Sequence, residues 1–295
     1  MRYDKWLNEN TESLAGKTVA VTGTTGGLGK ELCDFLASLG ATLILMDRNK
    51  KRSEAHRDEL KMRHGCDVTC INVDLEDINS VRAATSELLT NYKPDIFIHN
   101  AGAYSIPRKK CDTGMDNVFQ INFVSPYYMI REMLPTLKER HGRVAVVGSI
   151  AHNYSKIDIR DIDFATRSQA SKVYGNAKRY LMFSLYELFE GEEDVTLSVT
   201  HPGITFTNIT AHYPKVIYAL IKHPMKVIFM KPRKAALCIL RGLFDTCGYH
   251  EWIGPRVFDV WGLPKKKALK ACTAKESEKI AEIAEEIYSN LGDKL

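Results

Sequence analysis

Short apolar runs alternate with longer helical patterns along most of the chain, and this alternation constrains the fold more than any other feature. The runs are rich in Val, Ile and Leu, as are strands buried on both faces of a parallel sheet. They lie at residues 17–23, 42–47, 67–74, 95–100, 142–149 and 194–203. Between them, apolar residues recur at three- and four-residue spacing, which is typical of helices that cover a sheet. With right-handed crossovers, the pattern predicts a doubly wound α/β sheet.

The composition is that of an ordinary globular protein. No Gly-, Ser- or Pro-rich linker and no repeat divides the 295 residues, so we expect a single domain. The 41 basic and 36 acidic residues are interspersed, which indicates no nucleic-acid partner. The seven cysteines lack zinc-type spacing and predict reduced thiols and no metal site. Reduced cysteines suit a cytoplasmic protein, and no signal peptide and no apolar run of about 20 residues is visible.

The stretch TGTTGGLG at residues 22–29 follows the first apolar run and opens the first helical pattern. Glycines at 23, 27 and 29 allow a tight turn and a close approach of the backbone to a pyrophosphate. The helix that follows offers free N–H groups and a partial positive charge to phosphates. The stretch therefore predicts a dinucleotide-binding turn, with GxxxGxG spacing in place of GxGxxG.

Two neighbouring residues at the end of the second strand favour different cofactors. Asp47 can accept hydrogen bonds from the ribose hydroxyls of NAD and repels a 2′-phosphate. Arg48 can instead bind the 2′-phosphate of NADP. Because the glycine-rich turn carries no Lys or Arg, we favour NAD and keep NADP as the alternative.

Further polar residues follow the third and fourth strands. Asp74 can contact an adenine or cap the next helix, a role for which Asp77 competes. The small residues of NAG, at 100–102, leave room for a ribose and a nicotinamide. Farther along, the chain contains the Tyr-x-x-x-Lys pattern twice, at Tyr174–Lys178 and at Tyr218–Lys222. Both pairs can share a helix face, so spacing alone does not choose between them.

Together these stretches resemble the short-chain dehydrogenase/reductase family. The matching stretches follow the family's order between about residues 16 and 210: TGTTGGLG, Asp74, NAG, Asn122, Ser149, YGNAK at 174–178 and HPG at 201–203. This order assigns catalysis to Tyr174 and places Tyr218 in the family's variable lid region. The 25 residues from Ser149 to Tyr174 are similar to the spacing in the retinol-dehydrogenase-like and WW-domain-oxidoreductase-like branch. Ala177 and His99 depart from the family's commoner YxxSK and NNAG.

The resemblance implies one Rossmann-type domain over residues 1–295, with about seven strands in the order 3-2-1-4-5-6-7 and helices on both faces. It also implies a substrate lid at about 203–232, and the amphipathic pattern at 274–291 predicts a C-terminal helix. By resemblance, the cofactor-binding residues are Gly23, Thr25, Gly27, Leu28, Gly29, Asp47, Arg48, Asp74, Leu75, Asn100, Ala101, Gly102, Tyr174, Lys178, Pro202, Gly203, Ile204 and Thr207.

The catalytic residues implied by the resemblance are Asn122, Ser149, Tyr174 and Lys178. Oxidising an alcohol requires a base, and a free tyrosine is a poor one because its pKa is near 10. Lowering that pKa by ~3 units requires about 4 kcal/mol, which Lys178 and the oxidised cofactor can supply. Ser149 would hold the substrate oxygen. By resemblance, Lys178 also holds the nicotinamide ribose and Asn122 anchors a water of a proton relay.

The main hypothesis is a short-chain alcohol dehydrogenase or carbonyl reductase acting on a lipophilic retinoid, steroid or fatty aldehyde. The apolar residues of 206–231 favour such a substrate, and the interspersed lysines leave membrane-surface association open as the less favoured interpretation. The alternatives are a non-catalytic NAD(P)-binding sensor or scaffold and, less well supported, a sugar-nucleotide epimerase. We expect the segment 264–270, PKKKALK, to be a solvated turn rather than a lipid-binding patch. The resemblance allows a homodimer or homotetramer built through the two long helices.

Overall fold

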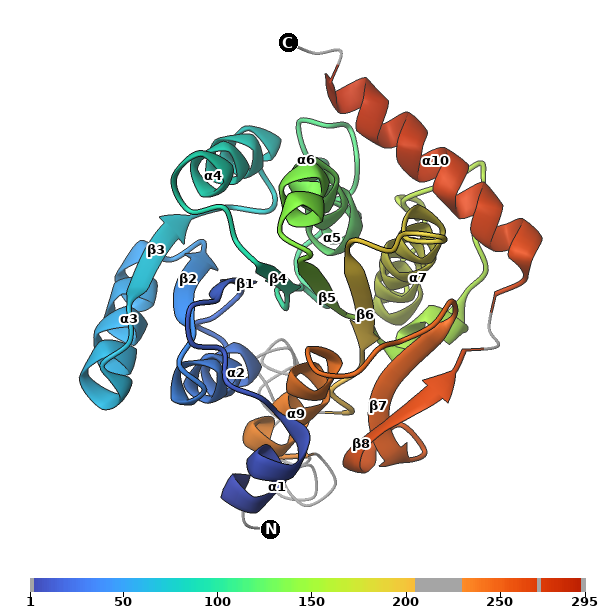
Figure 1. The fold of residues 1–295 in the computed structure, drawn as a ribbon. Coiled ribbons are helices and arrows are strands. Elements are labelled where there is room, and N and C mark those ends of the chain that lie inside the picture. Colours follow the sequence, from blue (N-terminus) through green and yellow to red (C-terminus); the bar gives the residue numbers. More distant parts are fainter. Residues whose placement is uncertain (1–2, 205–229, 270–271, 293–295) are drawn as a thin grey trace, which may run out of the picture.

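A single eight-stranded sheet forms the centre of the structure, a computed structural model that describes residues 3–204, 230–269 and 272–292. The strand order is β3-β2-β1-β4-β5-β6-β7-β8, with all neighbours parallel except β8, which pairs antiparallel with β7 (Figure 1). The strands are β1 Thr18–Thr22, β2 Thr42–Asp47, β3 Val68–Asn72, β4 Ile96–His99, β5 Arg143–Val147, β6 Thr196–Thr200, β7 Glu251–Val257 and β8 Trp261–Ala268. The predicted doubly wound sheet and its strand order are confirmed.

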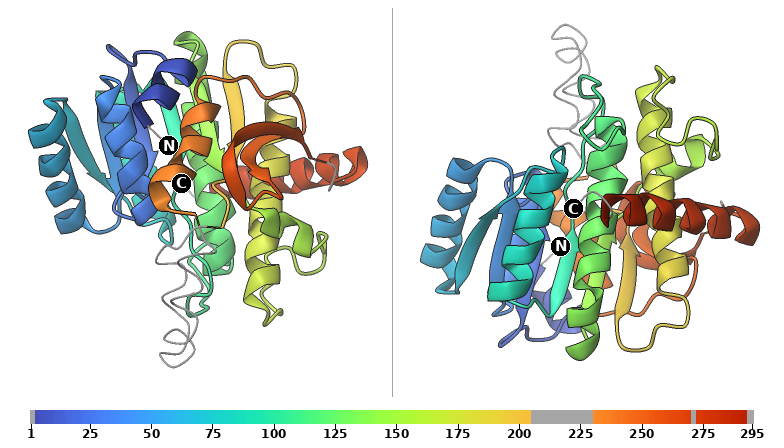
Figure 2. Two further views of the ribbon diagram at one scale, coloured as in Figure 1. Left: turned by 90° about the horizontal axis from the view of Figure 1, so that it is seen from below. Right: turned by 90° about the horizontal axis from the view of Figure 1, so that it is seen from above.

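Helices cover both faces of this sheet (Figure 2). On one face lie α1, α2, α3 and α9, and on the other lie α4, α5, α6, α7 and α10. Their bounds are α1 Tyr3–Asn10, α2 Gly27–Ser38, α3 Lys50–His64, α4 Ile78–Asn91, α5 Asn117–Phe119, α6 Ser125–Glu139, α7 Ala170–Leu188, α9 Pro232–Gly242 and α10 Ala274–Gly292. A π-helix η1, Gln120–Val124, joins α5 to α6, and a 3₁₀-helix η2, Ile150–Tyr154, follows β5.

The strands divide their side chains between two apolar cores because successive residues point to opposite faces of a sheet. In β1, Val19 and Val21 pack under α2 and α9, whereas Ala20 packs under α4, α6 and α7. All three side chains are fully buried. The near-continuous apolar runs noted in the sequence thus reflect burial on both faces.

The segment 264–270 was expected to be a turn, and this prediction is wrong. Residues 264–268 belong to β8, which pairs with β7 in a register that places Lys266 opposite Ile253. The segment forms the outer strand of the sheet, in which Lys265 and Lys266 are exposed and Lys267 pairs with Asp259.

Most of the predicted lid at about 203–232, including Tyr218 and Lys222, lies outside the described residues. Within the described part of the chain, no helix combines the length and the apolar character needed to cross a membrane.

Parallel strands bring the turns that follow them to one edge of the sheet. The turns after β1, β4, β5 and β6 begin near residues 23, 100, 148 and 201. These four turns contain most of the residues that the sequence singles out, and together they form the candidate site.

Candidate active site

The glycine-rich turn between β1 and α2 is folded so tightly that two of its glycines have no room for a side chain. A Cβ on Gly29 would lie 2.2 Å from the carbonyl oxygen of Gly23. Gly23 has a φ of +73°, and a Cβ there would lie 2.8 Å from Cα of Ala101. These two glycines are therefore required by the turn itself and by its contact with the NAG turn.

The third glycine of the pattern stands at the first position of α2 in a more open place. A Cβ on Gly27 would meet only the ring of Pro232, at 3.6 Å, which is ordinary contact. The N-cap residue Gly26 has no side chain with which to cap the helix. No side chain at this position therefore caps the first N–H groups of α2. Such uncapped N–H groups are what a helix start needs in order to bind a phosphate. The turn fits the pyrophosphate of a dinucleotide.

Asp47, at the end of β2, is bonded to the glycine-rich turn. Its carboxylate accepts hydrogen bonds from the Thr24 hydroxyl, from the Thr25 backbone N–H at 3.2 Å and from the Ser53 hydroxyl at 3.0 Å. Only 4% of Asp47 is exposed. The carboxylate is therefore largely engaged within the chain, a use that sequence reasoning did not foresee.

Arg48, in contrast, extends into solvent beside the same turn, with 68% of its side chain exposed. Its guanidinium lies 4.0 Å from Asp74 and 3.8 Å from Glu76, which are loose surface pairs. Of the two candidates for capping α4, Asp77 is the N-cap and accepts the N–H of Asn79. Asp74 instead accepts the N–H of Glu76. Leu75, next to it, is buried and accepts the Ser125 hydroxyl at its carbonyl.

The NAG turn is bonded to the glycine-rich turn. The side-chain amide of Asn100 donates to the carbonyl oxygens of Thr22 and Gly23 at 3.1 and 2.9 Å. The N–H groups of Asn100 and Ala101 both donate to the Thr22 hydroxyl. These bonds join the carboxyl ends of β1 and β4 and keep the two turns in register.

Asn122 is fully buried and lies in the π-helix η1, a type of helix that is often found at functional sites. Its amide nitrogen donates to the carbonyls of Ala103 and Val118, each at 2.8 Å. A Cβ on Gly102 would lie 2.9 Å from the Asn122 side-chain oxygen and 3.7 Å from Nζ of Lys178. The structure thus gathers Asn122 and Lys178 around the glycine of NAG.

Ser149 and Tyr174 meet where β5 ends and α7 begins. A hydrogen bond between them lowers the tyrosine pKa, but burial has the larger effect and raises that pKa to about 12. The phenol ring of Tyr174 stands edge-on to that of Tyr104, with 5.4 Å between ring centroids. It also packs against the apolar cluster of Val118, Phe164 and Val173. The predicted serine–tyrosine pair is therefore present in an apolar setting.

Lys178 is 4 residues after Tyr174 on α7 and is almost fully buried. Its Nζ lies 5.7 Å from the Tyr174 ring centroid and donates to the carbonyl oxygen of Val147 at 2.8 Å. Burial lowers the pKa of Lys178 to about 7. In the chain by itself, then, burial governs both pKa values, and the expected lowering of the tyrosine pKa by Lys178 is not present.

The HPG stretch follows β6 and packs against the β7–β8 hairpin. Gly203 has a φ of +79°, and a Cβ there would lie 2.7 Å from the Val260 carbonyl oxygen. His201 stacks on Trp252 with ring centroids 5.0 Å apart. Pro202 is buried, and Ile204 accepts the N–H of Met230 at its carbonyl oxygen. Thr207 lies outside the described residues.

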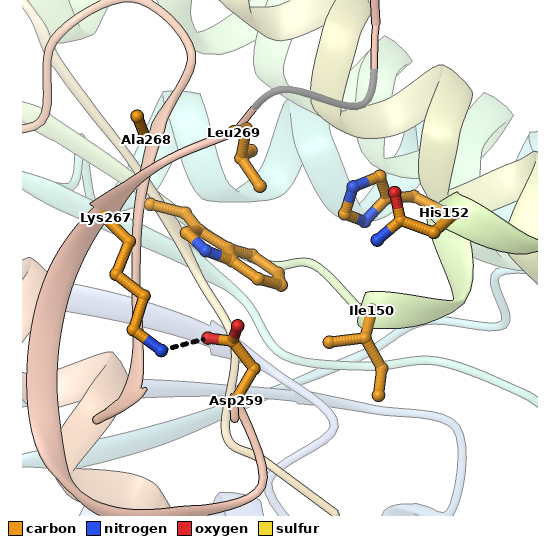
Figure 3. A pocket seen from close by; sticks show the side chains of 8 residues that line it. Ile150, His152, Asp259, Lys267, Ala268 and Leu269 are labelled. Carbon is orange, nitrogen blue, oxygen red and sulfur yellow. Dashed lines mark hydrogen bonds and ion pairs between the residues drawn. The ribbon is translucent and has the colours of Figure 1, made fainter. Parts of the chain in front are cut away.

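The turn that follows β5, residues 148–154, is called the serine turn because it contains Ser149. A cavity of about 380 Å³ lies beside this turn, between η2 and the β7–β8 hairpin (Figure 3). Figure 3 shows Ile150 and His152 on one side and Lys267 with Asp259 on the other, the last two joined by a 2.8 Å ion pair. His152 lines this cavity and is fully buried. The cavity shows that the hairpin faces the serine turn.

Sequence reasoning missed several residues that support the site, notably Thr24, His152, Gly175, Arg179 and Glu276. Gly175 and Arg179 lie one position after Tyr174 and Lys178, and this spacing alone does not single them out. No group of three or more His, Cys, Asp or Glu residues that could hold a metal ion occurs among the described residues.

Comparison with known proteins agrees with this geometry. The family model for short chain dehydrogenases matches residues 17–215. Among curated proteins, the chain is 32% identical over 251 residues to dehydrogenase/reductase SDR family member 13 of Bos taurus, covering 82% of this chain and 65% of that protein. It is 31% identical over 212 residues to retinol dehydrogenase 14 of Mus musculus, covering 67% and 64%. The chain thus spans about two thirds of the length of these relatives.

Solved structures show the same fold. A crystal structure of an uncharacterized protein from Mycobacterium paratuberculosis superposes with a TM-score of 0.76 at 22% identity, covering 94% of this chain and 95% of that one. L-sorbose reductase from Gluconobacter frateurii, in complex with NADPH and L-sorbose, gives a TM-score of 0.60 at 18% identity, covering 79% and 94%. The chain therefore belongs to the short-chain dehydrogenase/reductase family, in its retinol-dehydrogenase-like branch.

Proposed function

We propose that the protein is an NAD(P)-dependent oxidoreductase that transfers hydride between the nicotinamide and an alcohol or carbonyl substrate, with Tyr174 as general acid and base. The observation that carries this proposal is the meeting of Ser149, Tyr174 and Lys178 beside a glycine-rich helix start. A bound nicotinamide cofactor supplies the hydride donor or acceptor, and the chain supplies the proton.

The protonation states favour carbonyl reduction as the simpler direction. With a pKa of about 12, Tyr174 carries its proton at neutral pH and can donate it to a substrate oxygen that also accepts from Ser149. In the oxidation direction Tyr174 must first lose that proton. Protonated Lys178 beside the ring, together with the positive charge of an oxidised nicotinamide, would stabilise the phenolate.

The cofactor is held, in this proposal, by the glycine-rich turn, the NAG turn and the backbone of Ile204, with Thr207 added as the sequence predicts. The preference for NAD depended on a free Asp47 carboxylate. Since that carboxylate bonds to Thr24, Thr25 and Ser53, and Arg48 is exposed, we propose that NADP is accepted as well, with its 2′-phosphate on Arg48.

The substrate class follows from the surroundings of Tyr174. Its ring lies with Ile106 against Val118, Phe164 and Val173, and it stands edge-on to another phenol, that of Tyr104. Such a wall favours a lipophilic aldehyde, ketone or alcohol over a sugar. Several relatives are named as retinol dehydrogenases, which agrees with this choice.

The alternative of a non-catalytic sensor or scaffold makes a different prediction for a substrate screen. We expect the protein to oxidise NADPH or NADH with nonanal as substrate and much more slowly with glyceraldehyde, which carries the same reacting group on a polar chain. Cofactor binding without turnover of any aldehyde, ketone or alcohol would favour the sensor. Cytoplasmic location and the weaker expectation of membrane-surface contact through 206–231 stay predictions.

Oligomer formation through the two long helices α6 and α7 meets an obstacle. Helix α10 packs along α7 and also contacts α6, burying Ile280, Ile283 and Ile287 (Figure 1). We propose that any homodimer or homotetramer uses another surface, since this one is already covered by the chain itself.

A further inference from the structure

Helix α7 has a second face, one residue out of phase with its catalytic one, that packs directly on the turn presenting Ser149. A Cβ on Gly175 would lie 2.2 Å from the carbonyl oxygen of Ala151 in η2. The backbone of α7 therefore approaches η2 as closely as a helix can, which only glycine allows. The residue one helical turn later on this face is Arg179.

Arg179 joins three elements. It is 2% exposed, and it binds Glu276 of α10 with two bonds, Nε to Oε1 at 2.9 Å and Nη2 to Oε2 at 2.7 Å. Its Nη1 donates to the carbonyl oxygen of His152 in η2 at 3.0 Å. A two-bonded guanidinium–carboxylate pair holds both partners in one orientation, so α10 restrains the position of η2 through this side chain.

His152 continues the connection to the serine. Its Nδ1 lies 2.5 Å from the carbonyl oxygen of Ser149, and because a carbonyl oxygen can only accept, Nδ1 carries the proton. The backbone N–H of His152 donates to the same carbonyl at 3.1 Å. On the other side, the Ser149 hydroxyl accepts the N–H of Ala151 at 3.2 Å. The turn that orients the hydroxyl is thus bonded to His152, which is bonded to Arg179.

We propose that Arg179 and Glu276 are a positioning pair, through which the C-terminal helix α10 holds the η2 turn so that the Ser149 hydroxyl reaches Tyr174 and the substrate oxygen. Neither side chain touches the reacting atoms. The catalytic consequence of this pair rests on the proposed function. The restraint that the pair places on η2 does not depend on that function. Because a small misplacement of a catalytic group slows a reaction strongly, loosening this connection should lower turnover.

The chain offers a matched control on the same helix. Glu285, nine residues after Glu276 on α10, binds Arg131 of α6 at 3.0 Å and accepts the Tyr127 hydroxyl. This second tie fixes α10 to the molecule, and both of its partners belong to α6, not to η2. Glu285→Gln therefore weakens the attachment of α10 to α6 and leaves the contacts of the serine turn unchanged. Glu276→Gln weakens both the attachment of α10 and its connection to the serine turn.

The first test measures amide hydrogen exchange in the cofactor-free protein, which needs no substrate. We expect Arg179→Met and Glu276→Gln to raise the exchange rates of residues 150–154 by about tenfold or more, and Glu285→Gln to leave them within about twofold of wild type. Unchanged exchange at 150–154 in a folded Arg179→Met variant would overturn the proposal, whatever the enzyme's substrate. If Arg179→Met does not fold, Glu276→Gln gives the same comparison.

The second test measures kcat, KM and NADPH affinity with nonanal. We expect Arg179→Met to lower kcat by about 10- to 100-fold with NADPH affinity unchanged, and to do little in a Ser149→Ala background, where the change should be below about twofold. An equal loss in both backgrounds would show that Arg179 does not act through Ser149. Absence of activity in wild type would count against the proposed function alone, because the exchange test still decides the restraint.

Discussion

The glycine-rich turn and the serine turn lie at the same edge of the sheet, but different parts of the chain hold them. The glycine-rich turn is secured by residues close to it in sequence or on the neighbouring strands, chiefly Asp47 and Asn100. The serine turn is secured by Arg179 and, through it, by Glu276, 127 residues after Ser149. The glycine-rich turn is thus held by the chain around it, whereas the serine turn is connected to the C-terminal helix α10.

The largest expected effect on stability comes from breaking the glycine-rich turn. In Gly29→Ala the new Cβ would lie 2.2 Å from the Gly23 carbonyl oxygen, so the free energy of unfolding should fall by about 3 kcal/mol and cofactor binding should be lost. Gly27→Ala is the control. Its Cβ meets only a proline ring at 3.6 Å, so stability should change by less than about 0.5 kcal/mol while cofactor affinity falls. Urea unfolding and NADPH titration of both variants check this. Equal stability of the two variants would contradict the steric argument.

Lys178, beside the serine turn, gives the protein a dependence of stability on pH. The folded-state pKa of Lys178, about 7, lies below the ordinary value because of burial. Between pH 7 and pH 9 the unfolded chain therefore binds more protons at Lys178 than the folded chain does. The contribution of Lys178 to the free energy of unfolding should consequently rise by about 2 kcal/mol over this pH range. Lys178→Met removes the contribution. Urea unfolding at both pH values should show a smaller rise in the variant, and an identical rise in both proteins would contradict this assignment.

A smaller effect is expected at Asp47. Asp47→Asn keeps the shape but weakens the bonds from Thr24, Thr25 and Ser53, so stability should fall by about 1 to 2 kcal/mol. If the carboxylate serves the turn, the affinities for NADH and NADPH should fall together. A selective loss of NADH affinity, measured by fluorescence titration, would instead restore Asp47 to the ribose-binding role that the sequence favoured.

The contrast between local contacts and contacts from distant parts of the chain also explains how much could be predicted from sequence. The alternation of strands and helices follows from local patterns. The seven-strand order and the grouping of Ser149, Tyr174 and Lys178 follow from the family resemblance that the order of motifs carries. The strand β8 was missed because a lysine-rich segment has weak strand character, and only pairing with β7 defines it. The engaged state of Asp47 was missed because hydroxyl partners on two other elements leave no periodic signal.

Arg179 illustrates the limit most clearly. In the sequence it is one of many basic residues, next to the proposed catalytic Lys178, and nothing local distinguishes it from a solvent-exposed arginine. Its role depends on the arrival of Glu276 from the far end of the chain and on the close approach that Gly175 permits. Tertiary contacts of this kind are fixed by packing, which a single sequence does not display.

The most direct test of the central claim compares Tyr174→Phe with Tyr218→Phe, the tyrosines of the two Tyr-x-x-x-Lys patterns. In NADPH-dependent reduction of nonanal, we expect Tyr174→Phe to lose activity by about 1,000-fold or more with NADPH affinity within about twofold of wild type, because only the proton donor is removed. Tyr218→Phe should keep a kcat within about tenfold of wild type. Turnover by Tyr174→Phe at the wild-type rate would contradict the claim that this hydroxyl moves the proton.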